Sequence, residues 1–389
     1  MDASSNLRLF YITAIDNLPS ILERGILSRR KVEALSVEHA EIADHIILQQ
    51  RENISQLCKI DLFRFVNLYF QPRNPMLFRI IKEKGSENIC IIQIKSSILD
   101  RDDIFIADGN AASPRTTLYA KHSLKPSELN KIIEQTEKEY WSKGDNSKRK
   151  IMAECLVPDE VPPSYIHTIF VDSDASRRRV LGLIGHKMSI AVVPEPRLFF
   201  ASLWRKSITD RLTLIKGDMF FSSMQTLTIS VNTKGIMGRG LASRFKYQFP
   251  HVYVFYQDLC KRRVLRMGRP YLYKSEEPIE WTFLEEPLPS FQGEPKWFLL
   301  FPTKSDWRDK ADLDGISKGL DWIVENYEKE GIQSLAVPAL GAGLGRLEWY
   351  EVGPLIVRKL AQLPIPVEVY LPAEKEIPSD QLEGDFLLG

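Results

Sequence analysis

The apolar positions of this chain follow two different rhythms. Up to about residue 205, short β-rich runs such as 7–14, 89–94 and 151–157 are separated by irregular polar segments. Beyond that point, apolar strand-like runs alternate with segments in which apolar residues recur every three or four positions, as in 313–327. Regular alternation of strands and helices predicts an α/β sandwich with a largely parallel sheet in the second half.

Several segments of the first half lack a clear period. Residues 28–56 mix polar and apolar positions and are predicted as a long surface excursion. Residues 64–80 are aromatic-rich but broken by two prolines, which predicts a strand followed by a constrained turn. Helical spacing predicts an amphipathic helix over 126–141, and the charged segment 142–150 is predicted to be mobile.

The chain length of 389 residues fits two domains better than one. Because the change of rhythm falls near residues 204–208, we expect a first domain over 1–205 and a second over 206–375. The acidic, proline-containing residues 376–389 are predicted to form a loose tail. The two halves share no internal repeat, so they are expected to be different folds.

Composition narrows the class of protein. An apolar fraction of 44% and a net charge of +1 are ordinary for a globular protein, so no strong overall field draws the chain to nucleic acid. The four cysteines and six histidines form no ligand pattern, so we expect reduced thiols and no metal. With no apolar run of membrane-spanning length and no signal peptide, we expect a cytoplasmic protein without a membrane partner.

Two glycine-rich loops follow predicted strands of the second half. The first, VNTKGIMGRGLASRF from Val231, lies between an apolar strand and a helix start. The second, PALGAGLG from Pro338, follows another strand. Such loops present bare backbone N–H groups to an anion, and glycine permits both the tight turn and the approach of a diphosphate. Two of them can hold a diphosphate from both sides.

Two charged residues accompany these loops. Asp218 directly follows the first strand of this half and can accept a hydrogen bond from an adenine amino group, although it can equally cap a helix. Lys304 in FPTKSDW is the cation expected to lie between the two glycine loops in space. An isolated lysine is most often a solvated charge, so the motif around it decides its role.

The second half resembles the macrodomains, and within them the DarG antitoxins that remove ADP-ribose from DNA. The motifs are GD at 217–218, VNTKGIMGRGLASRF, FPTKSDWR and VPALGAGLGRLEW, over about 208–372. The resemblance implies a three-layer α/β fold and a hydrolase with Lys304 as its catalytic lysine, or else a domain that only binds ADP-ribose. The ADP-ribose contacts that it implies are Asp218, Asn232, Gly235, Met237, Gly238, Gly240, Thr303, Gly341, Gly343, Leu344 and Gly345.

Glu154 is the strongest polar anomaly of the first half. It interrupts the apolar strand IMAECLV, where a buried carboxylate needs a partner or a function, whereas an edge position would leave it in solvent. Breaking the nicotinamide–ribose bond of NAD passes through an oxocarbenium-like state. One carboxylate can stabilise that cation and take the proton of the incoming nucleophile.

The segments around Glu154 resemble DarT, toxins that transfer ADP-ribose from NAD to bases of single-stranded DNA. YITAIDNLPSILERGILS, YFQPRNPMLF, DGNAAS and KRKIMAECLVPDEVPPSYI occur in the family's order over about 7–193. The resemblance implies an α+β ADP-ribosyltransferase fold, NAD as the donor, and Glu154 and Arg51 as catalytic residues. The implied NAD contacts are Tyr11, Thr13, Asn17, Tyr69 and Arg73, and the implied DNA contacts are Arg115, Lys121 and Arg149.

Two positions depart from the DarT pattern. Tyr11 and Ala14 stand where the family usually carries histidines, and RFVN precedes YFQPR in place of a DYVP-like run. A tyrosine can hydrogen-bond a ribose or an amide, but it cannot act as an imidazole. These departures leave NAD affinity, rate and base choice open.

Together the two resemblances imply a toxin–antitoxin fusion that writes and erases ADP-ribose on single-stranded DNA, with phage defence as the context by analogy. Thymine is the favoured base and guanine the alternative. Two other hypotheses remain open. The first half can be a degenerate transferase that serves as a nucleic-acid-binding module, or the second half can be only a reader of ADP-ribose.

Overall fold

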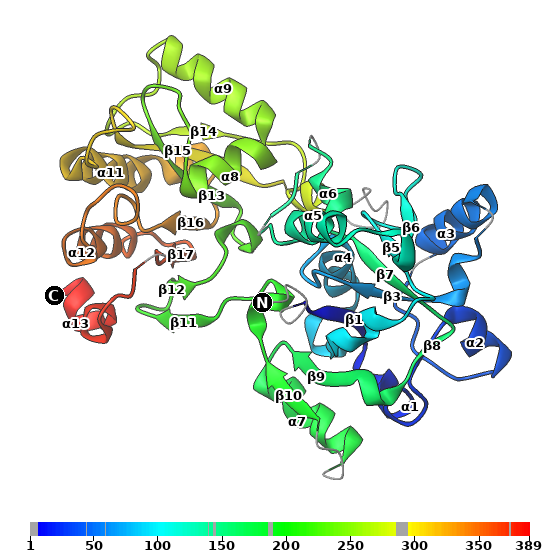
Figure 1. Ribbon diagram of the computed structural model, residues 1–389. Coiled ribbons are helices and arrows are strands. Elements are labelled where there is room, and N and C mark those ends of the chain that lie inside the picture. Colours follow the sequence, from blue (N-terminus) through cyan, green and yellow to red (C-terminus); the bar gives the residue numbers. More distant parts are fainter. Residues whose placement is uncertain are drawn as a thin grey trace. The chain divides into compact units, whose positions relative to one another are not determined.

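The structure is a computed structural model with two compact units (Figure 1). Unit 1 comprises Met1–Phe200 and Phe283–Glu286, and unit 2 comprises Ala201–Thr282 and Pro287–Gly389. The residues that the structure describes are 7–43, 45–58, 60–138, 140–142, 145–185, 190–284, 295–372 and 375–389.

Unit 1 is built on a sheet in which every neighbouring pair is antiparallel except β9 and β10. Its central strands are apolar on both faces, which is why the sequence shows continuous apolar runs there. In order of pairing the strands are β10 (Ala191–Pro194), β9 (Ile166–Val171), β4 (Ile89–Ile94), β1 (Leu9–Ala14), β3 (Phe65–Tyr69), β7 (Glu154–Pro158), β5 (Phe105–Ala107) and β6 (Leu118–Ala120). A separate pair joins β2 (Ile26–Leu27) to β8 (Glu160–Val161).

The helices of unit 1 correct three of the expectations from periodicity. The helices are α1 (Leu18–Arg24), α2 (Arg29–Ala34), α3 (His45–Cys58), α4 (Pro75–Lys84), α5 (Pro126–Thr136), α6 (Ser147–Lys150) and α7 (Asp174–Ile184). The supposed surface excursion 28–56 contains α2 and nearly all of α3. The supposed turn after β3 begins α4, where the Asn74 side chain accepts a hydrogen bond from Leu77 N and Pro75 occupies the first turn. The supposedly mobile segment before Glu154 contains α6, whose Ser147, Lys148 and Arg149 are buried.

Unit 2 has the alternating architecture that its sequence predicts. Its central strands β12, β17, β16, β13 and β15 run parallel, and the outer strands β11 and β14 pair antiparallel at the two edges. In order of pairing the strands are β11 (Trp204–Ser207), β12 (Leu212–Lys216), β17 (Val367–Tyr370), β16 (Leu335–Pro338), β13 (Thr226–Asn232), β15 (Trp297–Lys304) and β14 (Tyr271–Tyr273).

Helices complete the layers of unit 2 (Figure 1). They are α8 (Gly240–Gln248), α9 (Pro250–Lys261), α11 (Leu313–Glu330), α12 (Trp349–Leu360) and α13 (Gly384–Leu388), and the short α10 is Glu280–Phe283. Ile316, Leu320 and Ile323 of α11 are fully buried in one core with α12. Each such side chain contributes about 1.5–3 kcal/mol relative to exposure. Phe245 of α8 instead packs edge-on to Phe298 of β15, with ring centroids 5.0 Å apart.

The C-terminal residues differ from the loose tail expected for 376–389. They form a short 3-10 helix, Ser379–Leu382, followed by α13. Leu382 and Leu387 are buried in the core that includes α11 and α12, and Trp349 Nε1 donates to Gln381 O over 3.1 Å. The acidic composition of this segment concealed two well-spaced leucines whose burial holds it in place.

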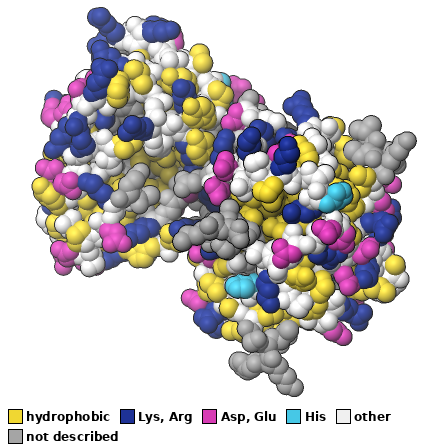
Figure 2. All heavy atoms as spheres, in the orientation of Figure 1, with side chains coloured by type: hydrophobic (Ala, Val, Ile, Leu, Met, Phe, Trp, Pro, Cys, Tyr) yellow, Lys and Arg dark blue, Asp and Glu magenta, His cyan; other side chains and the backbone are white. Residues whose placement is uncertain are grey.

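The surface carries no single dominant charge on the face drawn in Figure 2, where basic and acidic side chains are interspersed. This agrees with the net charge of +1. Within the described residues, no helix is long and apolar enough to cross a membrane.

Candidate functional sites

Glu154, at the start of β7, is completely buried and lies between neighbours on both sides. Across the sheet it pairs in register with Tyr69 of β3 and with Ala107 of β5. An uncompensated carboxylate at such a place would cost several kcal/mol, so its hydrogen-bond partners are essential to the fold. The solvent-facing alternative for Glu154 is therefore wrong.

Three donors from separate segments compensate this burial. Arg51 Nη2 of α3 donates to Glu154 Oε2 over 3.2 Å, and Arg51 Nη1 donates to Asn67 Oδ1 over 2.7 Å. The Asn67 amide in turn donates to Glu154 Oε2. The backbone N–H of Ala111 donates to Glu154 Oε1 over 3.0 Å. Because donors bind both carboxylate oxygens, the Glu154 side chain has little rotational freedom.

Asn67 is a site residue that the sequence reasoning missed. It stands in RFVN, the segment noted only for its departure from the DarT pattern. The signal was available, because Asn67 lies two positions from Tyr69 on the same strand and therefore faces the same side of the sheet. A polar residue in that register, beside the partner of Glu154, is a candidate for contact with the carboxylate.

A loop over 108–116 carries the Ala111 donor, and Arg149 fixes its shape. Arg149 Nη1 donates to Asp108 Oδ1 over 2.7 Å and to Thr116 Oγ1 over 3.1 Å, and its side chain is only 10% exposed. Asn110 N donates to Arg149 O over 3.0 Å. The structure thus places Arg149 inside the unit, bonded to the loop.

The predicted NAD residues near the start of the chain form a connected group. Thr13 is buried, and its Oγ1 accepts a hydrogen bond from Asn17 Nδ2 over 3.1 Å. The Asn17 amide also pairs with the backbone of Ala40, accepting from its N–H over 2.7 Å and donating to its carbonyl over 3.0 Å. On β1, burial and then the nearby Glu41 raise the pKa of Tyr11 to about 12, so its phenol remains a hydrogen-bond donor.

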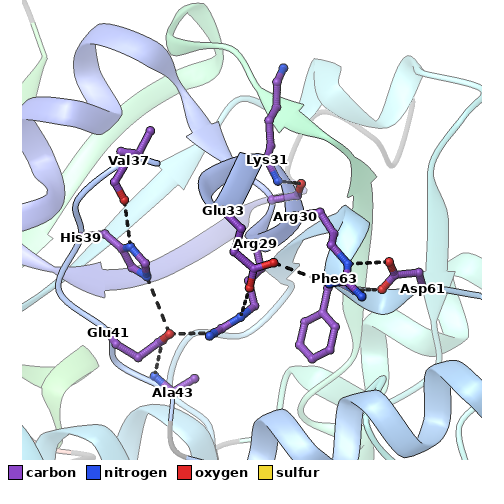
Figure 3. Close-up of polar contacts among 11 residues, drawn as sticks. Arg29, Arg30, Lys31, Glu33, Val37, His39, Glu41, Ala43, Asp61 and Phe63 are labelled. Carbon is purple, nitrogen blue, oxygen red and sulfur yellow. Dashed lines mark hydrogen bonds and ion pairs between the residues drawn. The ribbon is translucent and has the colours of Figure 1, made fainter. Parts of the chain in front are cut away.

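A network of charged residues holds the segment that follows α2 (Figure 3). Arg29 donates to Glu33 Oε1 over 3.1 Å and to Glu41 Oε2 over 2.7 Å. Arg30 donates to Asp61 Oδ2 over 2.8 Å and lies over the Phe63 ring. Exposed pairs of this kind contribute little stability individually. The Arg29–Glu41 pair and the Asn17–Ala40 pair hold residues 37–43, which carry Glu41 close enough to Tyr11 to raise its pKa.

The other predicted residues of unit 1 are Tyr69, Arg73, Arg115 and Lys121. The Tyr69 hydroxyl donates to Met76 Sδ, and the Arg73 guanidinium lies over the Phe200 ring, 4.8 Å from its centroid. Arg115 is exposed in the loop that carries Ala111, and Lys121 is half-buried after β6. These two cations remain accessible to a negatively charged partner.

In unit 2, three predicted loops meet at one edge of the sheet. They follow β16, β13 and β15, which are adjacent strands with β13 in the centre. Asn232 at the end of β13 pairs in register with Lys304 at the end of β15. Parallel strands present their carboxyl ends at the same edge, where ligands of α/β sheets bind. The loops that the sequence singled out are therefore neighbours.

Asn232 shapes the first glycine loop. Its Oδ1 accepts from Lys234 N over 2.9 Å, and its Nδ2 donates to Ile236 O over 2.6 Å, so the side chain closes the turn. Gly235 has φ +81°, which favours glycine, and a Cβ on Gly240 would lie 3.0 Å from Leu344 of the other glycine loop. The first loop therefore directly abuts the second.

The second glycine loop folds tightly on itself. A Cβ on Gly345 would lie 2.4 Å from Gly341 O, a distance that backbone atoms do not tolerate. Gly341 has φ +79°, while Gly343 is partly exposed and Leu344 is 56% exposed. Of the remaining predicted residues, Met237 and Thr303 are buried, 3% and 1% exposed, whereas Gly238 is exposed.

Lys304 connects the loop after β15 with the second glycine loop. Its Nζ donates to Asp309 O over 3.1 Å and to Leu344 O over 3.4 Å. Burial lowers its pKa below the usual lysine value, and the positive charge of Arg346 adds to this, while Asp309 opposes it. A lysine of lowered pKa gives up its proton more readily, which suits an acid in catalysis.

Asp218 follows β12, and β17 and β16 lie between that strand and β13 in the sheet. From β12 to β15 the sheet spans four strand spacings, about 19 Å at 4.8 Å each, which matches an elongated ligand. Asp218 accepts from Phe220 N over 3.2 Å and forms an ion pair of 2.8 Å with Arg244. It therefore does cap a short helix, and its contact with an adenine stays a prediction.

Two further expectations concern thiols and metals. Burial raises the pKa of the Cys155 thiol to about 12 and also raises that of Cys90, and both are free cysteines. In the described part of the chain, no three His, Cys, Asp or Glu side chains gather as a metal site requires.

Known proteins match both units in this order along the chain. A family model described as DarT, ssDNA thymidine ADP-ribosyltransferase, matches residues 10–200. A DNA ADP-ribosyl transferase–DNA ADP-ribosyl glycohydrolase fusion protein of Thermosipho africanus is 50% identical over 383 residues, 98% of each chain. The DNA ADP-ribosyl glycohydrolase of Thermus aquaticus is 33% identical over 164 residues, 42% of each chain.

A solved structure agrees over the same length. Thermosipho africanus DarTG in complex with ADP-ribose matches with a TM-score of 0.93 and 49% identity, covering 98% of this chain and 100% of that one. The resemblances inferred from the motifs and the two fold classes are thereby confirmed. With half of its residues identical over nearly the whole length of both proteins, the chain belongs to the family of DarT–DarG fusion proteins.

Proposed function

We propose that unit 1 transfers ADP-ribose from NAD to thymine in single-stranded DNA and that unit 2 removes it again. The observation that carries this proposal is the completely buried Glu154 carboxylate, held by Arg51, Asn67 and Ala111. A carboxylate held in this way can stabilise a positive charge that develops during the reaction. The matching family model and the fusion relative support the substrates.

In the writing step, the bond between the nicotinamide nitrogen and ribose C1″ breaks, and nicotinamide leaves with the electron pair. Glu154 stabilises the oxocarbenium-like cation, and Arg51 and Asn67 keep the carboxylate in place. A base nitrogen then bonds to C1″ and its proton passes to Glu154. In thymidine the one ring N–H is N3, so N3 is the attacking atom. Because the substrates are NAD and DNA, we place the activity in the cytoplasm.

The predicted NAD contacts would orient the donor in this step. The pair formed by Thr13 and Asn17 presents a hydroxyl and an amide beside Tyr11, whose phenol can donate to a ribose or carboxamide oxygen. The exposed Arg115 and the half-buried Lys121 can hold phosphates of the strand. The buried contacts of Arg149 support a role in holding the loop of Ala111 rather than a phosphate.

In the erasing step, water attacks C1″ and the bond to the thymine nitrogen breaks. The electron pair stays on that nitrogen, which takes a proton from the Lys304 ammonium, and the proton lost by the attacking water returns to the Lys304 amine. The two glycine loops would hold the diphosphate through backbone N–H groups, and Asn232 would face the distal ribose beside Lys304. Asp218, about four strands away, would meet the adenine.

Two reactions test the proposal with the full chain. A Lys304→Ala chain is incubated with NAD and oligonucleotides that contain a single thymine, and the nucleosides are analysed by mass spectrometry. ADP-ribosyl-thymidine is expected; a guanosine adduct would overturn the base, and the absence of any adduct would overturn the transferase. The purified product is then given to a Glu154→Gln chain. Release of ADP-ribose is expected, whereas binding without release would make unit 2 a reader.

A further inference from the structure

Three residues beside Lys304 are not among the predicted contacts with ADP-ribose, NAD or DNA. Trp307 lies in the loop after β15 and is 50% exposed, unlike the large aromatic side chains that form the core of unit 2. The Arg308 guanidinium lies over its ring, 4.6 Å from the centroid. Arg346 lies at the end of the second glycine loop and is exposed. A half-exposed tryptophan with two arginines differs from an ordinary solvated surface.

Arg346 joins the two loops that flank Lys304. Its Nη2 donates to Arg308 O over 2.8 Å, and Ala311 N donates to Gly345 O over 2.9 Å. Lys304 itself donates to Leu344 O across the same boundary. Trp307, Arg308 and Arg346 are therefore held on one rim of the hydrolase site, next to its lysine.

The backbone at Arg346 is strained, and a glycine at this position would avoid the strain. Its φ is +62°, in the left-handed region that favours glycine, although the same loop uses glycine at Gly341, Gly343 and Gly345. Backbone strain of this kind persists mainly at functional positions. The backbone conformation favours glycine here, so we attribute the presence of an arginine to its side chain.

We propose that Trp307, Arg308 and Arg346 form a binding surface for the DNA strand that carries the ADP-ribose. This rests on the proposed erasing reaction, in which the modified base leaves from C1″ beside Lys304, so the strand attached to that base must pass this rim. The Trp307 ring offers a stacking platform for a neighbouring base, and the two guanidinium groups offer partners for phosphates.

The acidic residues of the same loop do not oppose this assignment. Asp306 Oδ1 accepts from Arg308 N over 3.0 Å, and Asp309 Oδ2 accepts from Asp306 N over 3.1 Å. Both carboxylates thus bond to backbone N–H groups of their own loop. The loop keeps its shape through these bonds while Trp307 and Arg308 remain exposed.

The test compares two substrates of the full chain without NAD, so that nothing is rewritten. One is ADP-ribosyl-thymidine, and the other is a short single strand with the same mark at its centre. For each variant, the ratio of kcat/KM for the strand to kcat/KM for the nucleoside is measured. This ratio cancels any effect on Lys304 chemistry. We expect Trp307→Ala to lower it at least about 5-fold and Trp307→Phe to retain it, because a ring still stacks.

The two arginines are tested by the salt dependence of kcat/KM. Each of Arg308→Ala and Arg346→Gly should reduce the slope of log kcat/KM for the strand against log salt by about 0.7, one phosphate contact on a single strand. Arg346→Lys and the control Arg262→Ala, an exposed arginine at the end of α9, should keep the slope. Equal losses on both substrates, or an unchanged ratio and slope, would overturn the surface. If the unaltered chain cleaves neither substrate, the erasing reaction itself fails.

Discussion

The two sites of this chain solve opposite problems with different parts of the polypeptide. Unit 1 buries one carboxylate completely and surrounds it with side chains from α3 and β3 and a backbone donor from the loop 108–116. Unit 2 relies on backbone loops at the ends of three adjacent strands, with Lys304 beside them. In the proposed reactions the first arrangement stabilises a developing cation, and the second binds the diphosphate of ADP-ribose.

This difference decides which substitutions each site tolerates. A side-chain site loses its function when one polar atom is removed, because a buried charge loses a partner. A backbone site tolerates many side-chain changes but not an added Cβ where two loop segments touch. The two halves should therefore fail separately, and each for its own reason.

The largest effect is expected for Glu154→Gln. The amide retains the shape of the side chain but removes the negative charge that faces the oxocarbenium-like state, so transfer of labelled ADP-ribose from NAD to DNA should fall by at least about 1000-fold. Release of ADP-ribose from an oligonucleotide marked in advance should keep its normal rate. A variant that still writes at a tenth of the original rate would remove Glu154 from the centre of the mechanism.

Gly345→Ala should damage only the erasing half. Its Cβ would lie 2.4 Å from Gly341 O, so the loop must open, and we expect a loss of about 100-fold in kcat/KM for release, in the range of a displaced backbone donor. Gly384→Ala in α13 is the matched control, since a Cβ there meets nothing within 4 Å. Normal erasing by the Gly345 variant would contradict the backbone account of this site.

Arg149→Ala should slow transfer by about 10-fold or more through kcat, because the loop that presents Ala111 N–H to Glu154 loses its anchor to Asp108. Arg149→Lys should rescue little, since one ammonium cannot replace both contacts to Asp108 and Thr116. The exposed Arg178→Ala serves as control. A change confined to KM for DNA would instead indicate that Arg149 binds a phosphate.

The smallest effect concerns the pH dependence of erasing. If Lys304 acts as an acid, the rate should fall as pH rises through its pKa, at a pH below the usual lysine value because burial and Arg346 lower that pKa. Arg346→Gly removes one of these causes and should move the alkaline limb to higher pH. Lys310→Ala, in the loop after β15, is the control. A rate that rises over this pH range would show that the neutral amine reacts.

The sequence predicted unit 2 more fully than unit 1 for a physical reason. Strand–helix alternation marks each element of a parallel sheet, and the glycine loops follow strands whose carboxyl ends share one edge. In unit 1 the partners of Glu154 come from segments far apart in the chain, and no local pattern shows that Asn67 and Ala111 converge on it.

At single positions the sequence allowed two physical interpretations, and the structure favours the one that was not chosen. Pro75 signalled a turn, yet proline suits the first turn of a helix equally well, and the Asn74 cap settles the matter in favour of α4. Arg149 signalled a phosphate contact because it lies in a basic run, while its partner Asp108 lies far along the chain. Charge alone does not show whether an arginine faces solvent or pairs with a carboxylate of its own domain.

The most direct test of one chain that both writes and erases is the stoichiometry of NAD consumption. The full chain is incubated with excess NAD and a single strand containing one thymine, and free ADP-ribose is counted per strand over time. We predict continued release, well beyond one ADP-ribose per strand, that requires DNA and stops in both Glu154→Gln and Lys304→Ala chains. Consumption that halts at one equivalent, or proceeds without DNA, would contradict it.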